Sequence, residues 1–320
     1  MKRAVIFFAA LAVAGAVSAQ QYPTRTVRVV VPWPPGQATD LAARLVAQKL
    51  SETLGQPFVA DNRPGAGGQI GTEAVVKAAP DGYTLLAASS GPISIMPVLQ
   101  KTPYDPLKDL AGVSLIAKVP FALVTYPSFP AANAREFIAL IRANPDKYTF
   151  SSSGTGATAH LFAELFNSMA QLKARHIPYK GTVPALTDIM NGQIAYAIET
   201  VAATGTHIKA GRLKTYGVTT KVRTAALPDA PPLAEAADLP DYDAAAWIGY
   251  AAPPGTPREI LVRLAGEIQK AIAVPEVKER FVFLGMDTVS STPDEMAAFL
   301  RAEQDRYAKV VRDANIKIEQ

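Results

Sequence analysis

The 320-residue sequence contains no cysteine. This absence excludes disulfide bridges and metal sites built on thiolates. It also excludes a lipoprotein signal, because the lipid of such a signal is attached to a cysteine. The stability of the fold must therefore come from a packed hydrophobic core, and a chain of about 300 residues commonly divides such a core between two domains.

Long hydrophobic runs are scarce as well. The longest, residues 4–17, is too short for an ordinary transmembrane helix, which needs about 20 apolar residues. Two basic residues precede this run and a small-x-small motif ending at Ala19 follows it, which is typical of a secretory signal peptide. We therefore interpret residues 1–19 as a signal peptide, cleaved near Ala19-Gln20, and expect a soluble mature chain in the periplasm.

Charge of one sign and catalytic groups are also few. Acidic and basic residues are interspersed, and the formal net charge of +4 falls to about +2 once Lys2 and Arg3 are removed, so we predict no nucleic-acid partner. The only histidines are His160, His176 and His207, and no Gly-x-Ser-x-Gly motif occurs. We interpret His160 as a packing or surface residue, and we predict no catalytic residue, no metal site and no cofactor.

Alternation of apolar runs with helical patterns predicts an α/β fold. An apolar strand at 27–31, a Pro/Gly-rich loop at 32–36 and a helical pattern through Leu54 form the first unit. A strand at 58–60, a glycine loop at 63–68, a helix at 70–78 and a strand at 84–88 come next. Further strands are predicted at 149–151, 174–178, 195–199 and 213–219. This order favours largely parallel, mixed sheets flanked by helices. Helix starts are predicted with Thr256 and Thr292 as capping residues.

Two extended apolar stretches, 113–126 and 242–252, lack helical periodicity, and we interpret them as crossover strands. They divide the chain into lobe one, residues 22–120 plus 250–320, and lobe two, residues 121–249. Two lobes joined by two strands leave a cleft that opens and closes about these connections. The sequence thus predicts two α/β lobes with a cleft between them.

In lobe one, the candidate binding residues follow the first and third strands. A loop between a strand and a helix is where open α/β sheets bind ligands, and helix amides there favour an anion. Asp40 is interpreted as a helix cap, whereas Trp33 either lines the cleft or packs between the lobes. The hydroxyl groups after the third strand either face the cleft or form a surface turn. The candidates are Trp33, Gly36, Gln37, Ala38, Ser89, Ser90 and Gly91.

In lobe two, an uncharged loop rich in Ser, Thr and Gly joins a strand to a helix. Such a loop offers amides and hydroxyls to an anion that must later be released. Its candidates are Ser153, Gly154, Thr155, Gly156, Ala157 and Thr158.

Two further loops of lobe two add candidates. Tyr179 and Gly181 are expected to cover the ligand, whereas Lys180 is interpreted as a solvated charge. Glu199 and Thr200 end a predicted strand. Glu199 either accepts a hydrogen bond from an amine or hydroxyl of the ligand or faces solvent.

Seven segments together resemble the Bug receptors, the periplasmic binding proteins of tripartite tricarboxylate transporters. The resemblance covers nearly the whole mature chain in order. The segments are VPWPPGQATD at 31–40, NRPGAGG at 62–68, PDGYTL at 80–85, PYDP at 103–106, SGTG at 153–156, HIPYKG at 176–181 and APPGTP at 252–257.

The resemblance implies a Venus-flytrap fold in which two lobe-one loops and the start of a lobe-two helix hold a ligand carboxylate, without an arginine clamp. Members of the family bind dicarboxylates, citrate-like tricarboxylates, acidic amino acids and aromatic carboxylates. Two positions depart from the family pattern. Gln37 stands where a second glycine is usual, and residues 89–94 differ from the expected loop containing threonine and histidine. Ligand identity therefore does not carry over from relatives.

The function expected from the sequence is capture of a small organic carboxylate by a monomeric receptor, which delivers it to the membrane components of a tripartite tricarboxylate transporter. A receptor that presents its ligand to a two-component sensor is an alternative. A nucleotide-dependent or hydrolytic α/β enzyme is another, since Gly154, Gly156 and Ala159 form a degenerate dinucleotide fingerprint. Tyr179-Lys180 follows the next strand without the acidic residue that would bind a ribose hydroxyl, which disfavours an oxidoreductase.

The signal peptide generates the first prediction. The mature periplasmic protein should begin at Gln20, because the small side chains of Val17-Ser18-Ala19 fit the cleavage motif. N-terminal sequencing of the protein released from the periplasm measures this directly, and a first residue elsewhere would contradict the assigned site.

Overall fold

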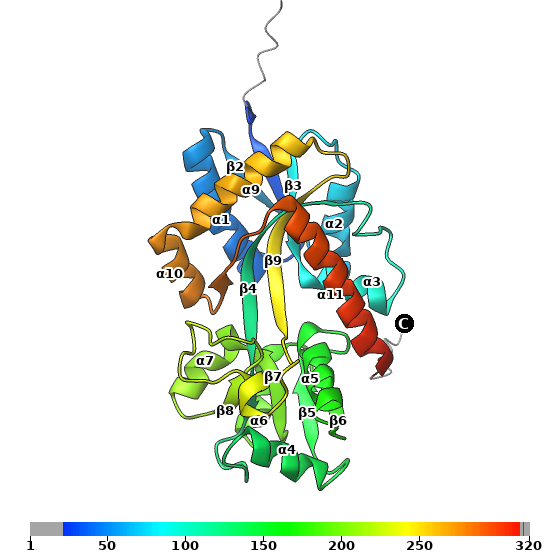
Figure 1. The fold of residues 1–320 in the computed structure, drawn as a ribbon, viewed down its shortest axis with the longest axis vertical. Helices are drawn as coiled ribbons and strands as arrows, with labels where there is room; N and C mark the ends of the chain where they lie inside the picture. The colour runs from blue at the N-terminus through cyan, green and yellow to red at the C-terminus, as the bar shows by residue number, and fades with distance from the viewer. Residues whose placement is uncertain (1–21, 314–315, 317–320) are drawn as a thin grey trace, which may run out of the picture.

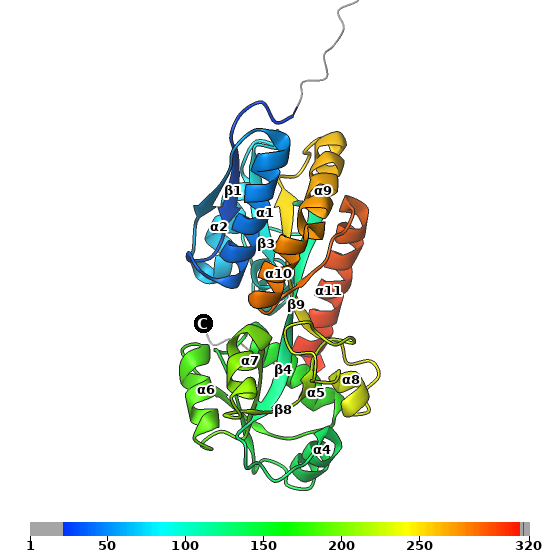
Figure 2. The same ribbon diagram turned by 90° about the vertical axis from the view of Figure 1, so that its left-hand side faces the viewer.

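The computed structural model describes residues 22–313 and 316 of the chain, so the expected signal peptide and its cleavage site lie outside the described residues. The molecule is elongated, with two groups of strands and flanking helices arranged one above the other (Figure 1). A view turned by 90° shows β4 running through both groups (Figure 2). Within the described residues, no helix is both long and apolar enough to cross a membrane.

The upper group in Figure 1 combines the two ends of the described chain. Strands β1, β2 and β3 are parallel, and β9 joins the sheet antiparallel to β3. The elements are β1 (Val27–Val31), α1 (Ala38–Leu54), β2 (Phe58–Asn62), α2 (Gln69–Val76), β3 (Thr84–Ser89), α3 (Met96–Leu99), β9 (Ala245–Ala252), α9 (Arg258–Ala273), α10 (Pro275–Phe283), β10 (Asp287–Thr288) and α11 (Pro293–Asp313).

The lower group comes from the middle of the chain. Strand β5 is parallel to both of its neighbours, β6 and β7. The elements are α4 (Ala134–Arg142), β5 (Thr149–Ser152), α5 (Thr158–Met169), β6 (Arg175–Pro178), α6 (Thr182–Met190), β7 (Tyr196–Thr200), α7 (Val201–Lys209), β8 (Lys214–Val218) and α8 (Leu233–Ala236). The expected alternation of strands and helices in a mixed α/β fold is confirmed. The predicted strands are found to within two residues at either end, except that the stretch predicted at 242–252 begins as a strand only at Ala245.

The fifteen-residue strand β4 (Ala111–Thr125) joins the two groups. Its residues 111–120 pair with β9, and its residues 121–125 pair with β7 and β8. Strand β9 pairs with β3 and β4 of the upper group, and the chain reaches it through residues 219–244. We propose that the two groups are the two lobes expected from the sequence.

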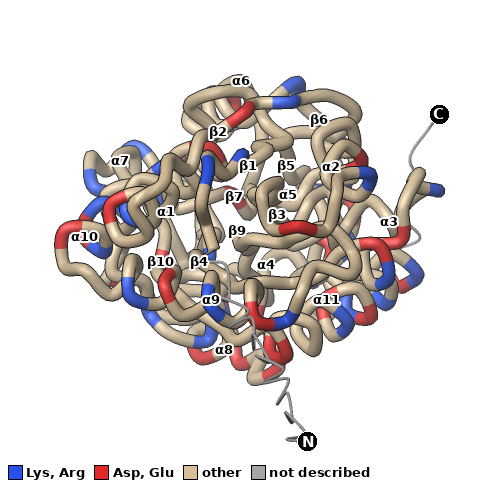
Figure 3. Tube along the Cα trace, turned by 90° about the horizontal axis from the view of Figure 1, so that it is seen from above, with Lys and Arg blue, Asp and Glu red and all other residues tan. Residues whose placement is uncertain are grey.

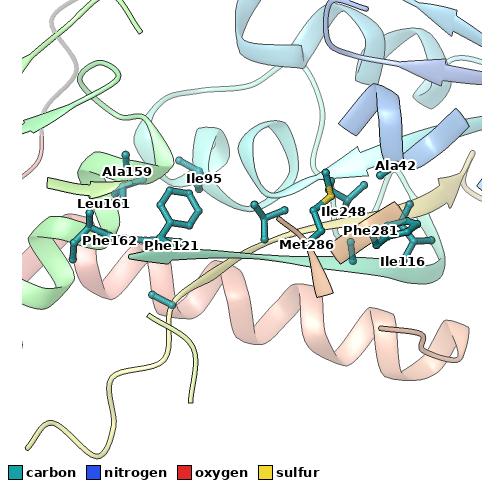
Figure 4. Packing of buried hydrophobic residues seen from close by; sticks show 14 of the residues in the cluster. Ala42, Ile95, Ile116, Phe121, Ala159, Leu161, Phe162, Ile248, Phe281 and Met286 are labelled. Carbon is teal, nitrogen blue, oxygen red and sulfur yellow. The ribbon is translucent and has the colours of Figure 1, made fainter. Parts of the chain in front are cut away.

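A single hydrophobic cluster continues along β4 from one group to the other. Figure 4 shows Ile116 and Ile248 at one end and Phe121 with Phe162 of α5 at the other. Phe121 packs edge-on against Phe162 at a centroid distance of 4.8 Å, and Tyr307 of α11 stacks on the same ring at 6.3 Å. Helix α11 therefore packs against both groups.

The two predicted helix starts have different outcomes. At α11, Thr292 Oγ1 accepts from the Glu295 N–H at 3.2 Å, and the Glu295 carboxylate accepts from the Thr292 N–H at 2.8 Å, so this capping box is confirmed. The predicted cap at Thr256 is wrong. Its hydroxyl donates to the Pro253 carbonyl at 2.9 Å, and α9 begins at Arg258. The side chain closes the preceding proline-rich turn and is therefore not available to the helix amides.

Basic and acidic residues are interspersed along the trace of the described chain (Figure 3). Many form short-range pairs along a helix, such as Lys77 with Glu73 and Lys309 with Asp313. Exposed pairs of this kind contribute only about 0.2–1 kcal/mol each. The buried core therefore dominates the stability of the fold.

An aromatic stack connects β5, α5 and β6. The rings of His160 and His176 are nearly parallel, with centroids 3.8 Å apart, and Phe150 stacks on His176 at 4.9 Å. His176 Nε2 contacts Ser152 Oγ at 2.7 Å. Burial and the neighbouring His160 lower the pKa of His176 to about 4. The stack therefore requires a neutral imidazole at this position.

This stack predicts that the free energy of unfolding falls as the pH is lowered from 6.5 to 4. In this interval the unfolded chain binds a proton at His176, whose ordinary pKa is 6.5, whereas the folded protein does not. Above pH 6.5 neither the folded nor the unfolded chain binds this proton, so His176 no longer lowers the free energy of unfolding. One proton corresponds to a slope of at most about 1.4 kcal/mol per pH unit, and partial exposure makes the effect smaller. Urea unfolding at several pH values measures it.

The control is His176→Phe, which keeps a flat ring in the stack but binds no proton. Its free energy of unfolding should depend less steeply on pH over the same interval. Equal slopes in the two proteins would contradict the assignment.

Candidate ligand-binding site

A cavity of about 710 Å³ lies between the loop before α1 and the loop before α5, one from each group of strands. The end of β3, the end of β7, the middle of β4 and the first part of β9 also contribute to its walls. This volume is in the range of small-molecule sites in proteins, about 300–1,000 Å³.

Most residues expected from the sequence line this cavity. They are Trp33, Gln37, Ala38, Ser89, Ser90, Gly91, Ser153, Gly154, Thr155, Gly156, Ala157, Thr158, Glu199 and Thr200. The lining residues do not include the predicted Gly36, Tyr179 and Gly181. Their role as ligand contacts stays a prediction.

The loop before α1 is held by the buried carboxylate of Asp40. This carboxylate accepts from the Gly36 N–H at 2.9 Å, from Asn62 Nδ2 at 2.8 Å and from Arg44 Nε at 2.9 Å. Burial alone would raise the pKa of Asp40, but these three donors lower it below its ordinary value. The expectation that Asp40 caps α1 is wrong in position. Gln37 precedes the helix, and Asp40 folds back from the first turn to hold Gly36.

Trp33 forms part of the cavity wall, and two contacts fix its ring. Its Nε1–H donates to Ser89 Oγ at 2.9 Å. A side chain at Gly91 would place its Cβ 3.2 Å from Trp33 Cζ2, so the missing side chain lets the ring approach closely. Ser89 and Ser90 are both buried, which excludes the alternative of a surface turn. Trp33 and Ser89 thus act as one unit of the wall.

The loop before α5 is held by internal hydrogen bonds. The Gly154 N–H donates to Ser152 Oγ at 3.2 Å, and the Gly156 N–H donates to His160 Nδ1 at 3.1 Å. These contacts correct the expectation that the loop amides as a group face a ligand, because both glycine N–H groups already have acceptors. The same bonds give the loop a defined shape.

Uncommitted amides remain in the first turns of two helices. The first N–H groups of a helix have no acceptor within it. Among the described residues, the N–H groups of Ala38, Thr39, Thr158 and Ala159 have no acceptor, and all four residues line the cavity. The positive ends of two helix dipoles therefore contribute to one cavity from opposite lobes.

Glu199 is the only ionisable residue among the described residues that line the cavity. Its side chain is 4 % exposed and accepts from the Thr200 N–H at 2.8 Å and from Thr182 Oγ1 at 3.1 Å. Burial raises the pKa of Glu199 despite these two donors. The alternative of a carboxylate facing bulk solvent is excluded.

Tyr179 and Gly181 occupy structural positions beside the cavity. The Tyr179 hydroxyl donates to Asp188 Oδ2 at 2.5 Å, and burial together with Asp188 raises the pKa of Tyr179 to about 12. Gly181 has a φ of 112°, which favours glycine, and directly precedes α6. In this structure neither residue covers the cavity.

Sequence reasoning missed the central wall and several residues beside the predicted loops. Val119 and Phe121 share one face of β4, since alternate residues of a strand point the same way. The sequence predicts both residues only as part of a crossover strand, and this position between the lobes is the one signal that points to the cavity. The missed lining residues are Thr39, Gly67, Ile95, Met96, Val119, Phe121, Ala159, Thr182, Ala246, Trp247 and Ile248.

The site offers binding groups in place of metal ligands. Within residues 22–313, no group of three or more His, Cys, Asp or Glu side chains is arranged to hold a metal ion. The lining combines apolar side chains from β4 and β9 with amides and hydroxyls from the helix starts. Such a lining suits a small molecule with an anionic group and a hydrocarbon part.

Comparison with known proteins gives a consistent result. The family described as "Tripartite tricarboxylate transporter family receptor" matches residues 42–316. Protein BugT of Bordetella pertussis is 39 % identical over 315 residues, covering 98 % of this chain and 96 % of BugT.

Two solved structures with bound carboxylates are similar to this chain. Rpa4515 of R. palustris with adipate has a TM-score of 0.78 and 34 % identity, covering 92 % of this chain and 99 % of the other. MatC of Rhodopseudomonas palustris with bound malate has a TM-score of 0.73 and 32 % identity, covering 91 % and 100 %. The chain therefore belongs to the family of tripartite tricarboxylate transporter receptors.

Proposed function

We propose that this protein is a periplasmic receptor that captures a small organic carboxylate in the cavity between its two lobes. It then delivers the ligand to the membrane components of a tripartite tricarboxylate transporter. The observation that carries the proposal is the meeting of two helix starts, α1 and α5, at one cavity whose described lining residues include no lysine, arginine or histidine.

The electrostatics of this arrangement suit reversible binding of an anion. Uncommitted N–H groups at a helix start favour a carboxylate, and the helix dipole adds to their attraction. Because these donors are backbone N–H groups that the helices already hold in place, little conformational entropy is lost on binding. A site without a formal positive charge also releases its ligand more readily than a bidentate arginine pair would.

The bound ligands of similar proteins support the proposed ligand class. Adipate and malate are both small dicarboxylates, and each is bound to a protein of similar fold over most of this chain. The proposed place of action, the periplasm, rests on the expected signal peptide at residues 1–19. We further propose that the receptor acts as a monomer.

Carboxylate binding should stabilise the protein against heat. A ligand that binds only the folded state adds about 2.7 kcal/mol at 100 times its dissociation constant, which is a shift in Tm of roughly 4–5 °C for a chain of about 300 residues. Thermal unfolding with adipate, malate, succinate, citrate, aspartate and benzoate tests this. A shift with NADH and none with any carboxylate would overturn the proposal in favour of a nucleotide-dependent protein.

Removal of one helix-start amide should weaken binding. Ala38→Pro deletes the N–H at the first position of α1, where proline is well tolerated. The preceding Gln37 has a φ of −76° and a ψ of 162°, which is the conformation favoured before proline. Affinity for the carboxylate found in the thermal experiment should fall at least about tenfold, because a charge-assisted hydrogen bond contributes about 1.5–3 kcal/mol. Titration calorimetry measures the loss.

The matched control is Ala38→Ser, which changes the same residue but keeps its N–H. Its affinity should stay within about threefold of the original protein. Circular dichroism checks that both variants are folded, and unimpaired binding by folded Ala38→Pro protein would exclude this amide from the site.

A further inference from the structure

Glu199 is a buried carboxyl group in a cavity that binds anions under the proposed function. Its side chain is 4 % exposed, and it lines the cavity together with the starts of α1 and α5. It forms no ion pair with any residue in the described part of the chain. A ligand carboxylate placed here without compensation would meet a second negative charge, so the role of Glu199 needs a separate explanation.

The sheet places Glu199 next to the loop before α5. Strands β5 and β7 are parallel neighbours, with Ser151 opposite Ala197. The carboxyl ends of parallel strands meet at the same sheet edge, and neighbouring strands lie about 4.7–4.9 Å apart. Glu199, at the end of β7, is therefore about one strand spacing from Ser152 and Ser153, where the loop that leads to α5 begins. The acceptor and the uncommitted amides of α5 line the same cavity.

The hydrogen bonds of Glu199 leave capacity for a ligand. A carboxylate offers about four acceptor positions, and the Thr200 N–H and the Thr182 hydroxyl occupy one on each oxygen. Both contacts stabilise the ionised form. A buried charge is tolerated only when it is paired, and among the residues that the structure describes at this cavity no cation is available to pair with it.

We propose that Glu199 accepts an ammonium group of the ligand, and that the receptor selects carboxylates that carry an ammonium next to the carboxylate over plain dicarboxylates. This inference rests on the proposed function, since the same ligand places its carboxylate on the helix-start amides. In an α-amino acid the two groups are attached to one carbon, so a single small ligand can meet both the acceptor and the amide donors that line this cavity. A hydroxyl in place of the ammonium would leave the charge of Glu199 unpaired.

The experiment uses ligands of equal length that differ only at one carbon. L-Aspartate, L-malate and succinate carry an ammonium, a hydroxyl and a hydrogen there, and L-glutamate with glutarate forms a longer pair. Titration calorimetry should give at least tenfold tighter binding of the amino member than of the unsubstituted member in one of the two sets. L-Malate should bind more weakly than L-aspartate.

The variant Glu199→Gln keeps the shape of the side chain and removes its charge. It should reduce the preference for the amino member at least tenfold, chiefly by weakening binding of that member. Glu303→Gln is the matched control. Glu303 is also a buried glutamate, 7 % exposed, but it lies on α11 away from the cavity lining, so its replacement should leave the preference unchanged.

A measurement on the unmodified protein decides the matter if Glu199→Gln does not fold. Calorimetry in two buffers of different ionisation enthalpy counts the protons bound on association. The amino ligand should take up fewer protons than the unsubstituted ligand, by up to one, because an ammonium keeps Glu199 ionised whereas a second carboxylate favours its protonated form.

The results distinguish a wrong role for Glu199 from a wrong proposed function. Binding of amino and unsubstituted ligands within threefold of each other, a preference for the hydroxyl member, or an unchanged preference in folded Glu199→Gln protein would each overturn the role of Glu199 and leave the carboxylate receptor standing. Absence of binding by any carboxylate would overturn the proposed function itself.

Discussion

The pairing of β4 with strands of both groups is the constraint on which the rest of the structure depends. Residues 111–120 belong to the upper sheet and residues 121–125 to the lower one, without a break in the strand. This continuity brings the starts of α1 and α5 to one cavity, although they come from different sheets. It also places Val119 and Phe121 in the cavity wall at the point where the strand passes between the groups.

The cavity combines partial positive charge from two helix starts with one buried carboxyl group, that of Glu199. The helix starts offer partial positive charge that costs nothing to hold, because it belongs to the backbone. Glu199 carries a full negative charge, or a proton, in surroundings that disfavour the charged form. Asp40 shows the contrast within the same molecule. It is equally buried, but Arg44 and two further donors keep it ionised, so its charge is already compensated and serves only to hold the loop.

Sequence patterns were most informative where local chemistry determines the structure. The Pro/Gly-rich loop before Gln37 and the Ser/Thr/Gly loop before Thr158 were recognised because strands, turn residues and helix starts have distinct local signals. The central wall had no such signal. Its geometry depends on residues 111–120 pairing with residues 245–252, which are more than a hundred positions away. The bond from Gly156 to His160 was missed for another reason, since a histidine four residues ahead acts as an acceptor only in one ring orientation and one tautomer.

The packed rings of Phe121, Phe162 and Tyr307 also bear on how far the two groups of strands could move. Phe121 and Phe162 belong to the lower group and Tyr307 belongs to α11, so the three rings tie the C-terminal helix of the upper group to the lower group. A close-packed contact of this kind resists separation, so any relative rotation of the two groups would have its axis near these rings. Displacement grows with distance from an axis. The loops farthest from the rings would therefore move most, and a few degrees of rotation would change the width of the entrance while the cavity wall beside Phe121 hardly moved.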